Sequence, residues 1–371
     1  MLRTETSRRL FIASSVSAFA LGAMLRPLRA AGAQQFPPAP LPPEDRRADP
    51  DMQRVLQQLA DFHSPRLPTV TPEVARELPT FADALQATLS AEGKPGVEPV
   101  GEILHRVIPG PGGQLLLRIY VPNGIAKPAP IAMYYHGGGF VIANLDTYDA
   151  SPRFLANGSG AAIVSVAYRK APEHPFPAAV EDAFAAYQWV LNNAASMGGD
   201  PRRVAVVGES AGGNLATVVS ILARDRKVPL PMRQVLVYPV TTFAAGPPPP
   251  SYLENPTTIP LATPDLAFFK KYYLRSPSEA TNPLVSPLFA NLKELSPATI
   301  INADIDPLRD NGAEYADKLR AAGVPVTRTL YRGVTHEFFG MVAAVAKRAR
   351  QCRKLRQRCA PASRPASSTW R

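Results

Sequence analysis

The sequence predicts an α/β fold with a mostly parallel sheet of eight strands that is flanked by helices. From Ile103 onward, two apolar segments of strand length follow one another closely, and later ones alternate with helical segments. A hairpin-like entry followed by βα repeats is typical of a doubly wound sheet. A chain of 371 residues can form one large domain of this class. The strands are expected at residues 103–107, 115–121, 131–135, 162–167, 204–207, 234–238, 298–303 and 326–331.

Helical spacing of apolar residues also occurs before the first strand, over 51–62 and 72–91, where no strand intervenes. We therefore expect residues 51–95 to form cap helices beside a catalytic domain over 96–346. A Pro-rich insert at about 240–290, with one helical piece, follows the carboxyl end of a strand, where a lid belongs. The remaining helices are expected at 147–159, 177–195, 211–223, 309–322 and 338–347.

Residues 1–33 have the pattern of a twin-arginine export leader. Arg8 and Arg9 precede a moderately apolar run, and Ala31-Gly32-Ala33 offers a small-residue cleavage site. The apolar run is shorter than the ~20 residues that a membrane span requires. We expect cleavage near Ala33, a periplasmic or secreted protein with no stable membrane span, and a Pro-rich linker over 34–50.

The formal net charge of +11 is concentrated at the two ends of the chain. Residues 343–371 hold nine Lys or Arg and no acid, and the leader is also basic, so the body is close to neutral. A nucleic-acid partner is therefore not expected.

The tail over 347–371 is basic on all sides and holds both cysteines. This abrupt change suggests a reading-frame shift or a strain-specific extension. The sequence does not determine the oligomeric state, and a homodimer is among the alternatives.

The segment Val204–Ala216 contains a Gly-x-Ser-x-Gly match between an apolar strand and an apolar helix. In such a turn the serine takes a strained conformation, and the flanking Gly208 and Gly212 lack the Cβ atoms that would collide. Ser210 would then stand at a helix N-terminus, where a developing anion is favoured. It is a candidate nucleophile, with a simple helix cap as the alternative.

A second glycine run, His136–Gly139, directly follows the strand over 131–135. Acyl transfer creates an oxyanion, and successive glycines can present backbone N–H groups to it without interference from side chains. The expected donors are the N–H groups of Gly138, Gly139 and Ala211. The alternative is a flexible turn. His136 itself is expected to orient the loop.

A nucleophilic serine needs a base, and the base needs an acid that holds its tautomer. With this kind of elbow the chain order is serine, acid, histidine, and His336 is the only one of five histidines that follows Ser210. The acid should end the strand over 298–303, where Asp304 and Asp306 both qualify. Asp306 precedes a proline and can also be read as a helix cap. No metal-binding or nucleotide-binding motif is present, so neither metal nor cofactor is expected.

These residues resemble the bacterial hormone-sensitive-lipase-like (family IV) esterases, which are α/β hydrolases. The resemblance covers about residues 71–345 and implies the triad Ser210, Asp306 and His336, an oxyanion hole, a helical cap and short acyl esters as substrates. Glu209 stands where the family more often has Asp or Thr. The motifs are His136–Phe140, Tyr168–Pro177, Gly208–Gly213, Asp306–Asp310 and His336–Gly340.

The sequence thus predicts an exported serine carboxylesterase that acts on a small-molecule ester through an acyl-enzyme. The same triad could instead cleave amides, lactones or acetylated sugars. A non-catalytic receptor for a small ligand is a further alternative, because fold does not fix function. The presence of His336 argues against the receptor.

Overall fold

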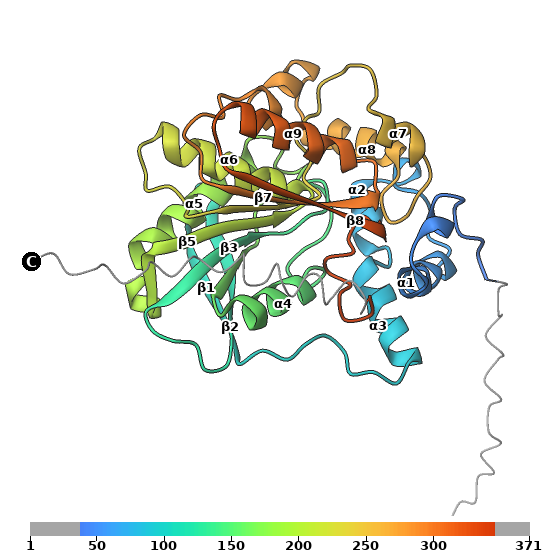
Figure 1. Cartoon of the computed structure of the whole chain (residues 1–371), viewed down its shortest axis with the longest axis horizontal. Coiled ribbons are helices and arrows are strands. Elements are labelled where there is room, and N and C mark those ends of the chain that lie inside the picture. The colour runs from blue at the N-terminus through green and yellow to red at the C-terminus, as the bar shows by residue number, and fades with distance from the viewer. Residues whose placement is uncertain (1–37, 346–371) are drawn as a thin grey trace, which may run out of the picture. The chain divides into compact units, whose positions relative to one another are not determined.

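The computed structural model describes residues 38–345, so the expected leader and tail lie outside the described residues. Its centre is a sheet of eight strands in the order β1-β2-β4-β3-β5-β6-β7-β8 (Figure 1). β1 and β2 form an antiparallel hairpin, β2 pairs antiparallel with β4, and the other pairs are parallel. The predicted sheet is confirmed. The strands are β1 Glu102–Gly110, β2 Gly113–Val121, β3 Ala129–Tyr135, β4 Ala162–Val166, β5 Gly199–Glu209, β6 Gln234–Val237, β7 Ala298–Ile305 and β8 Val326–Thr335.

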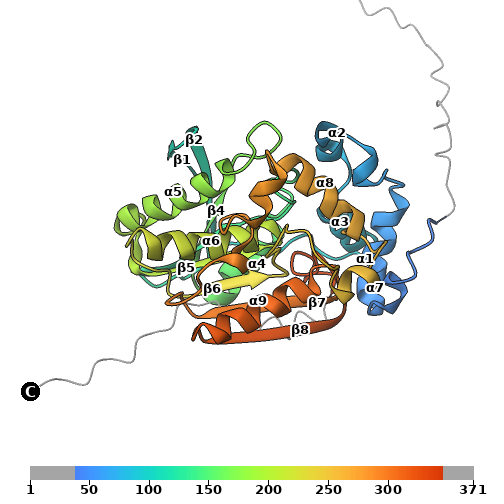
Figure 2. The same ribbon diagram turned by 90° about the horizontal axis from the view of Figure 1, so that it is seen from above.

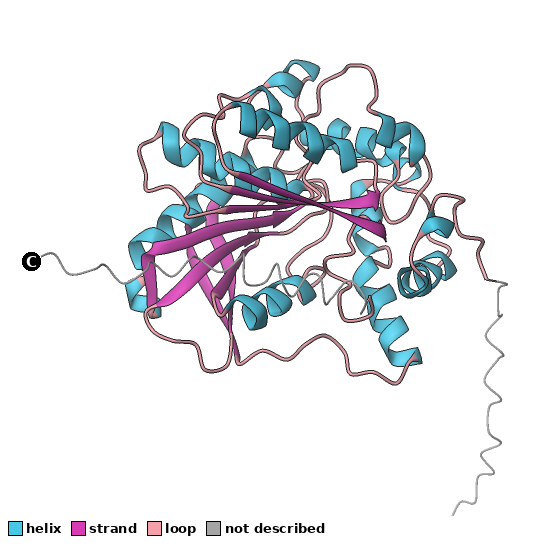
Figure 3. Cartoon of the chain, in the orientation of Figure 1, coloured by secondary structure: helices cyan, strands magenta, loops and turns pink. Residues whose placement is uncertain are grey.

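Helices cover both faces of the sheet (Figure 3). Side chains alternate between the faces along a strand, so Ile131, Met133 and Tyr135 of β3 join one apolar core and Ala132 and Tyr134 join the other. The first core includes α5, α6 and α9, and the second includes α4. Within residues 38–345, no helix has the length and apolar character that a membrane span needs. The bounds are α4 Ala150–Ser159, α5 Ala178–Asn193, α6 Ala211–Asp225 and α9 Arg309–Ala321.

Two segments that are far apart in sequence form the cap. The first runs from Asp45 to Ala91 and so includes the end of the expected linker, and the second lies between β6 and β7. Figure 1 and Figure 2 both show α8 beside α2. Buried Asp45 joins the segments by accepting hydrogen bonds from the Thr258 hydroxyl and, at 3.0 Å, from the Ile259 N–H. Arg66 adds an ion pair with Asp265 at 3.4 Å. The cap helices are α1 Pro50–Asp61, α2 Pro72–Glu77, α3 Phe81–Ala91, α7 Pro250–Glu254 and α8 Thr263–Tyr273.

The helical pattern over 72–91 corresponds to two helices, α2 and α3. Leu78 leaves the helical conformation (φ −70°, ψ 146°), as expected for a residue that precedes a proline. Thr80 then begins α3 with a capping box, in which the Asp83 carboxylate accepts the Thr80 N–H at 2.7 Å.

The predicted helix over 338–347 is wrong where the structure describes it. The chain after β8 forms consecutive turns, in which the N–H groups of Gly340 and Met341 donate to carbonyls three residues back, at 3.1 Å each. The apolar spacing that suggested a helix reflects burial of this segment against the sheet face that also carries α4. The last two residues of the predicted range lie outside the described part.

Candidate active site

Ser210 is the single residue between β5 and α6, and its backbone is strained, with φ +56° and ψ −117°. Residues with a Cβ rarely adopt this conformation. The turn is also crowded: a Cβ on Gly212 would lie 1.9 Å from the carbonyl oxygen of Tyr135. A Cβ on Gly208 would lie 2.0 Å from the carbonyl oxygen of Gly212. The elbow expected from the sequence is therefore present, and only glycine fits at its two flanking positions.

His336 and Asp306 follow β8 and β7, which are neighbouring parallel strands, so both side chains lie at the same edge of the sheet. His336 Nδ1 is 2.8 Å from Asp306 Oδ2. Because an ionised carboxylate only accepts, Nδ1 is the donor and Nε2 is left for the cavity. Asp306 Oδ1 accepts the Leu308 N–H at 2.8 Å. Of the two candidate acids, Asp306 is the one that contacts His336, while Asp304 still belongs to β7.

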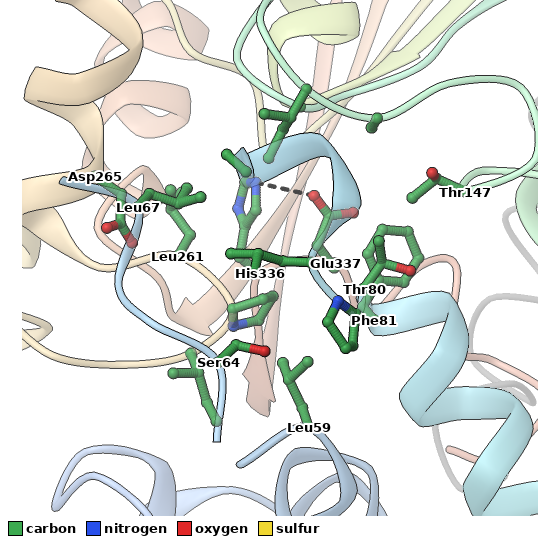
Figure 4. Close-up of a pocket in the computed structure, with 18 of the residues that line it drawn as sticks. Leu59, Ser64, Leu67, Thr80, Phe81, Thr147, Leu261, Asp265, His336 and Glu337 are labelled. Atoms are coloured by element: carbon green, nitrogen blue, oxygen red, sulfur yellow. Dashed lines mark ion pairs between the residues drawn. The ribbon is translucent and has the colours of Figure 1, made fainter. Parts of the chain in front are cut away.

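The surroundings of His336 favour its protonated form. Burial is the largest single effect and lowers the pKa of His336, but the neighbouring carboxylates, with Asp306 first among them, together outweigh burial, and the net shift of the pKa is upward. Glu337 and Glu209 act in the same direction. Figure 4 marks the closer of these two contacts, the 3.7 Å separation between His336 Nε2 and Glu337 Oε1. Burial raises the pKa of Glu337 to about 7 and also raises that of Glu209, so Asp306, which contacts Nδ1 directly, is the main partner of the imidazolium that forms when His336 takes a proton.

The glycine loop after β3 presents free backbone donors. Gly138 and Gly139 have φ +94° and +59°, and a Cβ on Gly139 would lie 2.1 Å from the ring of Phe269. Within residues 38–345, the N–H groups of these two glycines donate to no protein acceptor. Ala211 is the first residue of α6, a position whose N–H has no partner inside its helix. These three groups can donate to the oxygen of a bound molecule.

His136 supports this loop, and its imidazole is uncharged at neutral pH. Its Nδ1 lies 2.8 Å from the carbonyl oxygen of Gly137, and its ring stacks on Tyr168 at 4.3 Å. The Tyr168 hydroxyl donates to the His136 carbonyl at 2.8 Å. Burial lowers the pKa of His136 to about 3. The Ala171 N–H donates to the Phe140 carbonyl at 2.9 Å, so the loop after β4 braces the glycine loop from behind.

Two buried glutamates beside His336 were not predicted from the sequence. Glu337 accepts a hydrogen bond from the Tyr148 hydroxyl at 2.5 Å. Glu209 accepts hydrogen bonds from the hydroxyls of Tyr134 and Tyr238. The ring of Tyr238 also packs 4.3 Å from that of His336.

Of these two glutamates, only Glu209 stands out in the sequence pattern. Ala205 and Val207 of β5 face the second core, and Glu209 is the next residue on the same side of the strand. An ionisable residue therefore stands where a buried strand would normally have an apolar one. Glu337 lies directly before the segment 338–345, for which the sequence pattern predicts the wrong structure.

Ser210, His336, Gly138 and Gly139 line one cavity of about 490 Å³. Figure 4 shows His336 and Glu337 with cap side chains around them. The cap contributes residues from both of its segments, among them Leu59, Leu67, Phe81, Leu261 and Phe269. The elements that carry the expected chemistry therefore line one partly apolar cavity.

A family model described as the alpha/beta hydrolase fold matches residues 132–340. This chain belongs to the α/β-hydrolase family. The carboxylic ester hydrolase LipN of Mycobacterium tuberculosis is 42% identical over 257 residues, which cover 67% of this chain and 68% of LipN. Esterase LipI of the same organism is 40% identical over 256 residues, covering 67% of this chain and 78% of LipI.

A solved structure of a hyperthermophilic esterase from Pyrobaculum calidifontis matches this α/β hydrolase with a TM-score of 0.76 and 38% identity. The match covers 85% of this chain and 99% of that one. The resemblance to bacterial hormone-sensitive-lipase-like esterases is confirmed. The protein is a carboxylic ester hydrolase, and the receptor alternative is set aside.

Proposed function

We propose that this esterase hydrolyses short-chain acyl esters with Ser210 as nucleophile, His336 as general base and Asp306 as the acid that orients it. The observation that carries the proposal is the Asp306-bound His336, which shares one cavity with a serine in a strained elbow. The N–H groups of Gly138, Gly139 and Ala211 are proposed to bind the oxyanion. The cavity volume of about 490 Å³ lies toward the lower end of the range for small-molecule sites, which favours short acyl groups.

In the proposed reaction, Ser210 Oγ attacks the ester carbonyl carbon while His336 Nε2 accepts the hydroxyl proton. The tetrahedral oxyanion forms against the backbone donors. When it collapses, the alcohol leaves with the proton from His336, and Ser210 stays acylated. Water then attacks the acyl-enzyme with His336 again as base, which releases the acid and restores the serine.

A series of nitrophenyl esters from acetate to palmitate tests this function. We expect kcat/KM to be highest for acetate or butyrate and to fall steeply by octanoate, because longer chains have less room in a cavity of about 490 Å³. The mature enzyme and a Ser210→Ala variant are compared for every ester. Highest activity on palmitate contradicts the short-chain proposal, and equal activity of the two proteins contradicts the triad.

The pH profile should depend on Glu337. His336 must be neutral to act as a base, so kcat/KM falls as the pH drops through its raised pKa. Glu337→Gln removes the carboxylate 3.7 Å from Nε2, lowers the pKa of His336 and should move the acid limb of kcat/KM to lower pH. Glu314→Gln on α9 removes an exposed carboxylate and should leave the limb in place. If the acid limb of kcat/KM stays at the same pH, or moves to higher pH, in Glu337→Gln, then Glu337 does not raise the pKa of His336.

We also propose export through the twin-arginine route, on the strength of Arg8, Arg9 and the small-residue site that ends at Ala33. Replacing Arg8 and Arg9 by Lys should retain the precursor in the cytoplasm. Replacing Arg26 and Arg29 by Lys, a matched change outside the motif, should leave export intact. Cell fractionation and N-terminal sequencing of the mature protein measure the outcome. Normal export of the Arg8/Arg9 variant rules out this route.

A further inference from the structure

Arg76 bonds the cap directly to the backbone of the glycine loop after β3. It lies on α2, and its Nε donates to the Val141 carbonyl at 2.9 Å. Its Nη2 donates to the Ala171 carbonyl at 2.7 Å, and Nη1 and Nη2 each donate to an oxygen of the Glu173 carboxylate at 2.7 Å. The planar guanidinium makes these bonds in fixed directions. One residue of the cap therefore holds the glycine loop and the loop after β4 together.

Two peptide groups connect Arg76 with the cavity. The Val141 carbonyl shares its peptide group with the Ile142 N–H, which donates to the Gly138 carbonyl at 2.9 Å. The Gly138 carbonyl in turn shares its peptide group with the Gly139 N–H. Both peptide groups are trans, so the C=O and N–H bonds of each point in opposite directions. The Gly139 N–H therefore points away from the turn that the Gly138 carbonyl closes.

This hydrogen-bond relay, from Arg76 through two peptide groups to the Gly139 N–H, ends beside the candidate nucleophile. Gly139 lines the same cavity as Ser210, and its N–H has no protein acceptor within residues 38–345. The loop also abuts the elbow, because a Cβ on Gly137 would lie 3.2 Å from the carbonyl oxygen of Glu209, the residue before Ser210. The relay thus begins at a cation and ends at a donor on the cavity wall.

The other donor of the glycine loop is backed by neutral groups. The Gly138 N–H shares its peptide group with the Gly137 carbonyl, which accepts from His136 Nδ1 at 2.8 Å and from the Tyr168 hydroxyl at 3.3 Å. Burial keeps the pKa of His136 at about 3, so this imidazole carries no charge. Of these two glycine donors, only the Gly139 N–H is therefore connected to a cation.

The positive charge at the start of the relay strengthens the donor at its end. Hydrogen bonds from a cation are stronger than neutral ones, and consecutive hydrogen bonds polarise one another. Hydrogen bonds from Arg76 lower the pKa of Glu173 to about 2, so both charges are present at neutral pH. The Glu173 carboxylate opposes the polarisation, but its side chain is 48% exposed, against 22% for Arg76, so water screens the carboxylate more.

We propose that Arg76 is a positioning residue of the oxyanion hole, which orients and polarises the Gly139 N–H through the two peptide groups of the relay. This inference rests on the proposed function and extends it to a residue of the cap. The oxyanion donor then reaches its full strength only while α2 is bonded to the glycine loop.

Arg76→Gln and Arg76→Lys test the relay on the nitrophenyl esters of acetate, butyrate and hexanoate. kcat is expressed per Ser210 labelled by a fluorophosphonate, so unfolded protein does not contribute. Gln removes the charge, and kcat should fall about tenfold on all three esters at nearly constant KM, less than the 10²–10³-fold cost of losing a whole donor. Lys keeps a charge that can donate to the Val141 carbonyl, so it should recover most of kcat.

Two further variants separate the relay from a general role of ion pairs in the cap. Arg54→Gln breaks the pair with Glu92, whose closest atoms are 2.7 Å apart, and should leave kcat close to that of the parent. Glu173→Gln removes the carboxylate that opposes Arg76, so kcat should equal or exceed that of the parent. A loss in Glu173→Gln as large as in Arg76→Gln overturns the proposal, because the pair and not the cation would then be required.

A role in seating the cap, or in contacting the ester, predicts a different pattern for Arg76→Gln. The loss would then appear in KM and grow from acetate to hexanoate, and this result overturns the proposal. Arg76→Lys that is no better than Arg76→Gln also overturns it. An unchanged kcat in Arg76→Gln overturns the relay and leaves the esterase function standing, whereas a parent without turnover of any ester overturns both.

Discussion

Replacing Asp306 with Asn is expected to lower kcat by about 10⁴-fold while the fold stays intact. The carboxylate makes two contacts, Oδ2 with His336 Nδ1 and Oδ1 with the Leu308 N–H, each at 2.8 Å. In the variant, the amide oxygen can keep the Leu308 contact, which directs the NH₂ group toward His336. Nδ1 must then accept, the proton moves to Nε2, and His336 can no longer take a proton from Ser210.

The matched control is Asp304→Asn, because Asp304 is a half-buried residue of β7. We expect its turnover on nitrophenyl butyrate to stay within a few-fold of the parent. Thermal melting of both variants should lie close to the parent, since the Leu308 contact survives in Asp306→Asn. Near-normal turnover in Asp306→Asn, with collapse in Asp304→Asn, would falsify the assignment.

The parts of the site that depend on local backbone geometry could be predicted from the sequence. A serine between Gly208 and Gly212 predicts a strained elbow, because no residue with a Cβ fits where β5 and α6 meet. The glycine loop predicts free backbone donors for the same reason. The alternation of apolar segments predicted the eight strands, since parallel strands that are covered on both faces must be apolar throughout.

The parts that depend on tertiary contact could not be predicted. Asp304 and Asp306 both follow the strand expected over 298–303, and Pro307 indicates a turn at Asp306, but the contact of Asp306 with His336 depends on where β7 ends, at Ile305. The pairing of Glu337 with Tyr148 joins residues 189 positions apart. Segment 338–345 has helical spacing of apolar residues, but burial against the sheet imposes turns instead.

Replacing Ser210 with Gly or with Ala is expected to lower kcat by about 10⁶-fold, because the hydroxyl that forms the acyl-enzyme is gone. The two variants should nevertheless differ in stability. Ser210 holds φ +56° and ψ −117°, a conformation that strains any residue with a Cβ. Ala keeps that strain, whereas Gly removes an energy on the order of 1–3 kcal/mol.

Glycine also gains freedom in the unfolded chain, which offsets about 0.4–1 kcal/mol of that relief. Ser210→Gly should therefore be more stable to unfolding than Ser210→Ala by about 1 kcal/mol. Urea denaturation of both inactive variants measures this difference without any contribution from turnover. If Ser210→Ala is the more stable of the two, the elbow stores no strain, and the crowding at Gly208 and Gly212 alone explains the glycines. A more stable Ser210→Gly means that the strain is retained for catalysis, since it holds the hydroxyl clear of the sheet at the N-terminus of α6.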